Sequence, residues 1–233
     1  MIISANQPYF CPYPGFFYKA WLSDVLVLLD EVQFPRRTTW LSRNRFKNDQ
    51  GELWLTIPVW KKGLGLQNIN RVKICREGRW PRKHLASLTA AYGHAPYLEE
   101  HVPFLEKMFS PGFTRLVDLN VAVIRYLLAC FQVDTKVVLQ SELRVTGRGT
   151  GLLVELCRAL GATTFLILAP VTKYLEADRF AQAGIELRPF TYVAPVYPQL
   201  WGEFLANLSA FDLIFNCGPK AREILLKTQP AAR

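Results

Sequence analysis

The segment Val25-Leu26-Val27-Leu28-Leu29-Asp30-Glu31 begins with five apolar residues and ends with two acidic ones. A short apolar run between polar residues is typical of a strand buried on both faces, as in a parallel sheet covered by helices. Ligands of such sheets bind beyond the carboxyl ends of the strands. We therefore expect the acidic pair to lie at a ligand-binding edge.

Similar short runs recur along the chain, at residues 2–4, 137–139, 164–168 and 186–193. Between them the apolar residues have helical spacing, at residues 16–23, 118–131, 151–160, 174–183 and 208–217. This alternation predicts an α/β fold with a mostly parallel, Rossmann-like sheet flanked by helices. We expect a single domain over residues 1–233, with a helical segment at about 81–132.

A basic β-hairpin insertion is expected at about 40–75. Residues 45–47 and 53–59 have strand character on either side of Asn48-Asp49-Gln50-Gly51, a turn rich in residues that tolerate unusual dihedral angles. A second strand pair is expected through residues 69–74. From Arg36 to Lys83 the chain carries thirteen basic and three acidic residues, a net charge of +10, against +9 for the whole chain. Such a concentration of charge attracts anionic partners.

Four tryptophans are interleaved with these basic residues, namely Trp40, Trp54, Trp60 and Trp80. Their rings could stack on a nucleobase or a sugar ring. The partner expected first is a small anionic or phosphate-bearing substrate, and nucleic acid comes second because no RNA- or DNA-reading motif occurs. The alternative is that the arginines form a solvated sheet face and the tryptophans form its core.

The composition excludes several classes of protein. With 233 residues, of which 50% are hydrophobic, the chain can bury a substantial core. No apolar stretch reaches the roughly 20 residues of a membrane span, and the first residues lack the features of a secretory signal. The five cysteines are odd in number and form no Cys-x-x-Cys motif, which favours a reducing, cytoplasmic environment. The spacing of the three histidines predicts no metal site.

The most informative loop follows the first predicted strand and reads Asn6-Gln7-Pro8-Tyr9-Phe10-Cys11-Pro12-Tyr13-Pro14-Gly15. It places side-chain amides and a helix start at one edge of the sheet, where backbone N–H groups can bind anions. Nucleotide binding at this edge is therefore one hypothesis. The glycine-rich segment 147–151 offers a second anion site, unless it is an ordinary loop with Thr150 as a helix cap.

Motifs at both ends of the chain resemble the WbqC-like protein family. The matching residues near the start are Gln7, Pro8, Pro12, Gly15, Lys19, Asp30, Val32, Gln33, Arg43, Asn44, Arg45 and residues 54–59. Those near the end are Tyr197, Pro198, Gln199, Gly202, Phe204, Asn207, Leu208, Ser209, Asp212 and residues 216–218. The resemblance covers nearly the whole chain and implies sugar or acyl-group transfer in the biosynthesis of surface glycans or other metabolites.

Two departures from the family pattern bear on activity. Asn6 stands where the pattern opens with histidine, and an amide cannot serve as a general base near neutral pH. Ala169 and Pro170 stand where the pattern tends to show Ser-Gly. We expect an altered specificity or a loss of activity if these positions handle the substrate.

The candidate catalytic residues are Asp30, Asn6 and Asp212, of which Asp30 is the acid–base candidate. The candidate substrate-binding residues are Gln7, Tyr9, Gly15, Lys19, Gln33, Arg43, Asn44, Arg45, Lys173, Tyr174 and Gln199. The cationic ones would hold phosphate, and the amides suit sugar hydroxyls or the edge of a base. The alternatives are that Asp30 pairs with an arginine, that the amides tie loops together, and that Cys217 is a buried structural thiol.

The function expected is group transfer from a nucleotide-activated or carrier-linked substrate. One alternative is a non-catalytic binding module for nucleic acid or an acidic carrier protein, and another is a scaffold that has lost catalysis. The sequence identifies no cofactor and no oligomeric state.

Overall fold

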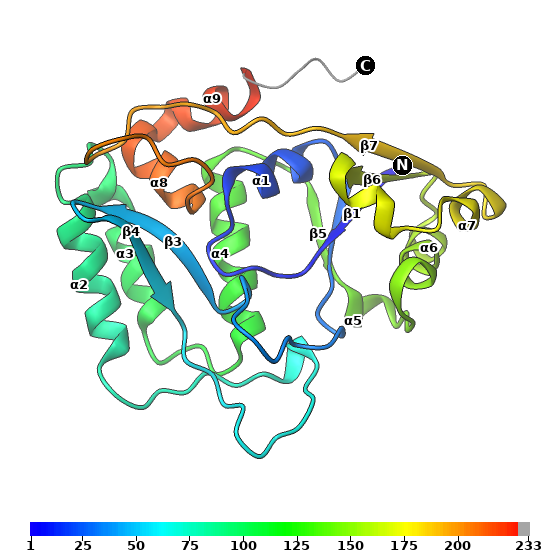
Figure 1. Cartoon of the computed structure of the whole chain (residues 1–233), viewed down its shortest axis with the longest axis horizontal. Coiled ribbons are helices and arrows are strands. Elements are labelled where there is room, and N and C mark those ends of the chain that lie inside the picture. Colours follow the sequence, from blue (N-terminus) through cyan, green and yellow to red (C-terminus); the bar gives the residue numbers. More distant parts are fainter. Residues whose placement is uncertain (228–233) are drawn as a thin grey trace.

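The computed structural model describes residues 1–227 and has a parallel sheet at its centre (Figure 1). Its strands are β1 (Ile2–Asn6), β2 (Val25–Leu28), β5 (Lys136–Leu139), β6 (Thr164–Leu168) and β7 (Glu186–Phe190). They lie in the order β5-β2-β1-β6-β7, and every neighbouring pair is parallel. The predicted α/β fold with a Rossmann-like sheet is confirmed.

The two faces of the sheet are covered by different helices. Leu26 and Leu28 of β2 belong to the core beneath α1 (Pro14–Trp21) and α4 (Leu116–Cys130). Val25 and Val27 of the same strand point to the opposite face, in the core beneath α6 (Gly149–Leu160) and α7 (Ala177–Gln182). Because both faces are covered, the β2 sequence is continuously apolar instead of alternating.

The segment between β2 and β5 contributes most of its buried apolar side chains to the larger of the two hydrophobic cores, the one that lies beneath α1 and α4. Strands β3 (Arg43–Asn48) and β4 (Gly51–Thr56) form the predicted antiparallel hairpin. Helices α2 (Trp80–Tyr92), α3 (Leu98–Phe109) and α4 follow and account for the predicted helical segment. The prediction of a second strand pair is wrong, because Ile69–Arg71 forms the 3-10 helix η1 and only single bridges join Val59 to Ile74 and Lys73 to Arg115.

Residues 191–209, here called the strap, lead from β7 across α1 to the hairpin side of the molecule (Figure 1). There the chain forms α8 (Ala210–Cys217), η3 (Gly218–Lys220) and α9 (Ala221–Lys227). Two backbone hydrogen bonds fix the end of the strap, from Ser209 N to Arg45 O and from Ala210 N to Pro12 O, each 2.8 Å long. The strap thereby joins the hairpin to the loop that follows β1.

The remaining short elements lie after the carboxyl ends of two strands. Helix α5 (Gln140–Leu143) follows β5, and the 3-10 helix η2 (Ala169–Tyr174) follows β6. Within residues 1–227, no helix has both the length and the apolar character needed to cross a membrane.

Candidate site at the carboxyl edge of the sheet

The strand order places a topological switch point between β1 and β6. The connection from β1 through α1 to β2 covers one face of the sheet, whereas the connection from β5 through α6 to β6 covers the other. In open sheets of this kind the two connections diverge at the carboxyl ends of the central strands and leave a crevice there. At this point Asn6 is the last residue of β1 and Gln7 follows it, and η2 follows β6.

The loop after β1 is held in place by two buried asparagines. Asn44 of β3 donates from Nδ2 to Phe10 O at 2.9 Å and to Cys11 O at 2.7 Å. Asn120 of α4 donates to Pro8 O at 2.7 Å and to Leu41 O at 2.8 Å. Cys11 has a left-handed backbone with φ of 45°, which is costly for a residue other than glycine. Asn44 therefore holds a strained loop in place. Asn120 was not among the predicted site residues, but a polar residue among the buried apolar positions of a helix is the pattern that could have identified it.

Lys19 brings an amine to the end of β1. Its side chain extends from α1 back toward the amino end of the helix, as helical side chains do. Its Nζ donates to Ala5 O at 2.8 Å and to Asn6 Oδ1 at 2.6 Å. The residue is only 7% exposed, and burial lowers its pKa from 10.5 to about 7. Lys19 is therefore a buried amine that titrates near neutral pH at the switch point.

Two polar side chains of the loop remain without protein partners. The Gln7 amide and the Tyr9 hydroxyl are half-buried, and neither has a hydrogen-bond partner in the part of the chain that the structure describes. Burial raises the pKa of Tyr9, so its hydroxyl keeps its proton at neutral pH. The amide can donate and accept, and the hydroxyl can do the same. These groups are suited to contact a polar ligand.

Gly15 allows two aromatic rings to cover the start of α1. A Cβ atom at this position would lie 2.4 Å from Tyr13 Cε2 and 2.7 Å from Tyr192 Cδ1. The two rings have centroids 5.8 Å apart in an edge-to-face arrangement. Tyr192 belongs to the strap, so the strap closes over the helix start at which the sequence predicted anion binding. A ligand would reach these backbone N–H groups only past the rings.

Asp30 lies at the same edge, where it links two strands. It is buried, and its carboxylate accepts hydrogen bonds from the Ser141 backbone N–H at 3.0 Å and the Ser141 hydroxyl at 2.6 Å. Its partner is therefore the start of α5, not Arg43 or Arg45. Gln33 is exposed a few residues further on, where its backbone pairs with Asn68.

The outer face of the hairpin carries a stack of cationic and aromatic groups. The Arg43 guanidinium lies 3.7 Å from the centroid of Trp54, whose ring stacks on Trp40 with centroids 5.6 Å apart. Trp40 is 45% exposed and Trp54 is 38% exposed. Arg45 instead pairs with Glu52 and donates to carbonyls of the strap at 3.3 and 3.2 Å. Trp80 is buried in the core, so it belongs to no surface platform.

The residues after β6 are more open. Tyr174 is 74% exposed, and the Lys173 amine lies 5.1 Å from the centroid of its ring. One alternative for the glycine-rich segment is an ordinary loop with Thr150 as a helix cap, but the N-cap residue of α6 is Arg148. Thr150 lies inside α6, and its hydroxyl accepts a hydrogen bond from Glu176 N at 3.1 Å. It thereby ties α6 to the segment that follows η2.

Asp212 and Gln199 lie in a separate buried network between the strap, the hairpin and α8. Asp212 accepts hydrogen bonds from Tyr92 at 2.7 Å and Tyr197 at 2.8 Å. Burial raises its pKa, whereas the two tyrosines and Lys47 oppose that rise. Gln199 exchanges two hydrogen bonds with the backbone of Leu205, each 2.9 Å long. This network, which we call the Asp212 cluster, is made of Lys47, Tyr92, Tyr197, Gln199 and Asp212.

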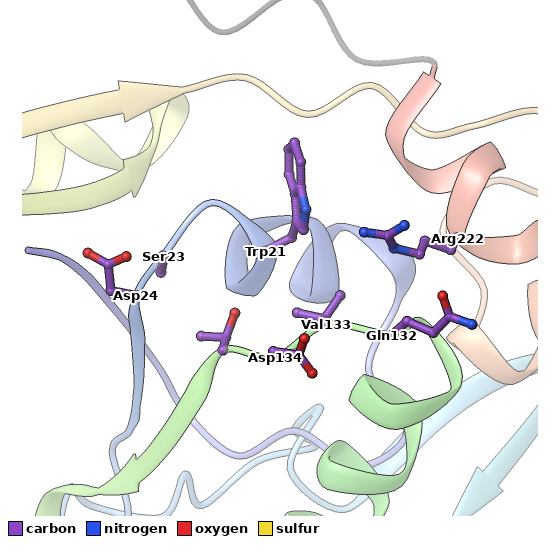
Figure 2. Close-up of a pocket in the computed structure, with 8 residues that line it drawn as sticks. Trp21, Ser23, Asp24, Gln132, Val133, Asp134 and Arg222 are labelled. Carbon is purple, nitrogen blue, oxygen red and sulfur yellow. The ribbon is translucent and has the colours of Figure 1, made fainter.

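A well-defined hollow on the described surface lies elsewhere. It has a volume of about 360 Å³ and is at the opposite edge of the sheet, near the starts of β2 and β5. Figure 2 shows Trp21, Asp24, Asp134 and Arg222 among its lining residues. No predicted site residue lines it.

Residues 1–227 contain no group of three or more His, Cys, Asp or Glu side chains placed to hold a metal ion. Cys217 is buried, and burial raises its pKa to about 11, as expected for a structural thiol.

Comparison with known proteins identifies a family. The WbqC-like protein family matches residues 7–224. The chain is also 28% identical over 226 residues to the uncharacterized protein Rv1507c of Mycobacterium tuberculosis, with 96% of each chain covered. No solved structure matches.

Proposed function

This chain belongs to the WbqC-like protein family, and from that premise we propose that it is a group-transfer enzyme. Its substrate is nucleotide-activated or carrier-linked, as in the biosynthesis of surface glycans or other metabolites. The reaction takes place beyond the carboxyl ends of β1 and β6, where sheets of this order bind ligands. The observation that carries the proposal is the buried Lys19 amine, held there by Ala5 and Asn6.

Lys19 has the chemistry of a general base in this setting. A neutral amine has two N–H bonds and one lone pair. Its two N–H groups donate to Ala5 O and Asn6 Oδ1, so the lone pair is not used by these contacts. The lone pair then takes a proton from the hydroxyl or amino group of the acceptor substrate. As that oxygen or nitrogen bonds to the transferred carbon, the leaving phosphate or thiolate departs with the electron pair of the bond that breaks. A pKa of about 7 suits this role at neutral pH.

The other candidates have supporting roles in this proposal. Asn6 orients the amine and Asp30 holds the edge of the sheet together, so both are positioning residues. Gln7 and Tyr9 contact the polar part of the substrate, because their amide and hydroxyl have no protein partner within residues 1–227. Arg43 is the cation for a phosphate, since its guanidinium lies 3.7 Å from the centroid of the Trp54 ring and forms no ion pair in the described chain.

Thermal unfolding with candidate ligands tests the proposal. We would use nucleoside diphosphates, nucleotide sugars and acyl-coenzyme A, since a ligand at 100 times its dissociation constant stabilises the native state by about 2.7 kcal/mol. We expect one of these classes to raise the melting temperature. Turnover of that ligand with an added hydroxyl or amine acceptor should be lost in Lys19→Met, which keeps the volume of the side chain, while the ligand still binds.

Lys47→Met is the matched control, because Lys47 is also a buried lysine but belongs to the Asp212 cluster. It should lower stability without changing turnover at a temperature where the variant is folded. The proposal is contradicted if none of these ligands raises the melting temperature, or if Lys19→Met turns over as fast as the unaltered chain.

A second candidate function rests on the exposed stack of Trp40, Trp54 and Arg43. Aromatic rings beside arginine bind single-stranded nucleic acid by stacking and by phosphate contacts. A non-catalytic module of this kind would bind short RNA with a steep dependence on salt, and Trp54→Ala would weaken binding. Small-molecule binding that persists at physiological salt, with turnover that is lost in Lys19→Met, would favour the enzyme instead.

A further inference from the structure

Residues 60–66 form an exposed loop with apolar side chains at its tip. The sequence is Trp60-Lys61-Lys62-Gly63-Leu64-Gly65-Leu66, and every one of these residues is exposed. Leu64 is 51% exposed, Leu66 is 58% exposed and Trp60 is 43% exposed. In Figure 1 the cyan loop projects from the body of the molecule. Three large apolar residues are thus presented on one projection, which marks an interaction site more often than chance exposure does.

The base of this loop is closed by hydrogen bonds. Trp60 N donates to Lys73 O at 3.0 Å, and Gln67 Nε2 donates to Trp60 O at 3.0 Å. Gly63 and Gly65 have positive φ values of 77° and 62°, which let the chain reverse direction at the tip. The leucines are therefore held outward by a compact loop with its ends close together.

Only positive charge flanks the loop in sequence. No acidic residue occurs between residues 53 and 76, whereas five basic ones follow Trp60, namely Lys61, Lys62, Arg71, Lys73 and Arg76. Lys61 and Arg36 also line a hollow of about 250 Å³ beside the loop. A partner that covers the leucines would therefore meet cationic groups around them, and charge complementarity requires that partner to be anionic.

We propose that residues 60–66 dock the protein on the surface of an anionic phospholipid membrane. Leu64 and Leu66 enter the boundary between headgroups and acyl chains, and Trp60 lies at headgroup level, where its amphipathic ring is favoured. Lys61 and Lys62 contact headgroup phosphates, and the hollow beside Arg36 has room for one. The inference goes beyond the proposed group transfer and does not depend on it.

Aliphatic side chains at the tip favour a bilayer over nucleic acid. Bases stack on aromatic rings, and phosphates need only cations, so neither would use two exposed leucines. A bilayer interface accepts both the leucines and the lysines, because it presents acyl chains beneath a negatively charged surface. The loop and the Trp40–Trp54 stack are therefore distinct surfaces with different partners.

Vesicle co-sedimentation tests the proposal directly with the chain of 233 residues. We expect binding to vesicles of phosphatidylglycerol mixed with phosphatidylcholine, and much weaker binding to pure phosphatidylcholine. The double variant Leu64→Ser/Leu66→Ser should bind the mixed vesicles at least about tenfold more weakly, from the lost apolar burial. Lys61→Gln and Lys62→Gln should each cost about fivefold, and the salt dependence of binding should decrease.

Val196→Ser is the matched control, because Val196 is 74% exposed but lies on the strap. It should leave vesicle binding unchanged, and none of these surface variants should lower the melting temperature. The fluorescence of Trp60, taken as the difference between the unaltered chain and Trp60→Phe, should shift to shorter wavelength on mixed vesicles.

Three outcomes would overturn the proposal. The first is that the unaltered chain does not sediment with mixed vesicles. The second is that the leucine double variant binds them as well as the unaltered chain, which would make the contact purely electrostatic. The third is that the chain forms a dimer in solution that the double variant abolishes, which would make a second copy the partner of the leucines.

Discussion

Two groups of motif residues contrast in how their polar atoms are satisfied. In the Asp212 cluster, both carboxylate oxygens accept tyrosine hydroxyls, and the Lys47 amine donates to Gln199 and to the Glu203 carbonyl. At the end of β1, the Gln7 amide and the Tyr9 hydroxyl have no protein partner among residues 1–227. A buried network with its bonds complete joins parts of the protein, whereas half-buried polar groups without protein partners at the carboxyl edge of a sheet are available to a ligand.

Within one set of motifs, the contrast separates residues that stabilise the fold from residues that we propose to bind a ligand. Residues near both ends of the chain match the same family, yet those near the end fasten the strap to the hairpin. The residues near the start frame the switch point of the sheet. If this division is correct, variants of the Asp212 cluster change stability and variants of the β1 edge change ligand binding.

The largest expected effect is on the Asp212 cluster. Asp212→Ala leaves two buried tyrosine hydroxyls without their acceptor and removes the negative charge near the buried Lys47, which should lower the free energy of unfolding by about 3–5 kcal/mol. Urea denaturation measures this loss. Asp49→Ala, at an exposed hairpin turn, is the control and should change it by about 0.5 kcal/mol at most. A variant that keeps its stability but loses ligand binding would invert the comparison.

The second largest loss of stability is expected at Asn44, which joins the hairpin to the loop that follows β1. Asn44→Ala removes two hydrogen bonds to buried carbonyls and should cost about 2–3 kcal/mol in urea denaturation. Because the loop carries Gln7 and Tyr9, ligand affinity should fall as well. Asn48→Ala, at the other end of the same strand, should have a smaller effect on stability and none on affinity. Equal effects of the two variants on affinity would show that Asn44 does not position the loop.

The fold could be predicted because its signals are local. The apolar run of β2 follows from burial on both faces, and the hairpin follows from its turn residues. The region around residues 69–74 was predicted wrongly because its pairing consists of single bridges to distant segments. Thr150 as a helix cap, one of two alternatives for its segment, is excluded for a similar reason, because its hydroxyl accepts a hydrogen bond from Glu176, which follows β6 in the sequence.

The site could be predicted only in part. The motifs named Lys19 and Gln7 as candidate site residues, but they could not indicate that Lys19 reaches back to Asn6, because that depends on how α1 packs on the sheet. Tyr92 is 120 residues from Asp212 in sequence, and no local pattern pairs them. Asn120 was within reach, since a polar residue in the same helical stripe as Ile124 and Leu127 indicates a buried hydrogen bond.

The titration of Lys19 should make stability depend on pH. In the unfolded chain the amine keeps its proton up to pH 10.5, whereas in the folded chain burial lowers its pKa to about 7. Between these values the unfolded state binds more protons, so the free energy of unfolding rises with pH, by up to about 1.4 kcal/mol per pH unit. This contribution is complete above pH 10.5 and is lost as the pH falls through 7.

Urea denaturation at several pH values between 7 and 10 measures this slope. Lys19→Met should flatten it, because the group that titrates is removed. Lys107→Met, at an exposed position of α3, should leave it unchanged. An unchanged slope in Lys19→Met would mean that the amine is not desolvated in the folded protein, and the general-base proposal would lose its support.

The smallest expected effect on stability, from Gln7→Ala, discriminates best between the two groups. Its amide makes no protein hydrogen bond within residues 1–227, so its removal should change the free energy of unfolding by about 0.5 kcal/mol at most. Affinity for the nucleotide sugar or acyl-coenzyme A that stabilises the unaltered chain should nevertheless fall about tenfold, the equivalent of one lost hydrogen bond to a ligand. Gln199→Ala is the mirror control, because that amide is fully bonded to Leu205 and should lower stability without lowering affinity. The same pattern in both variants would mean that complete hydrogen bonding does not separate structural from functional amides in this protein.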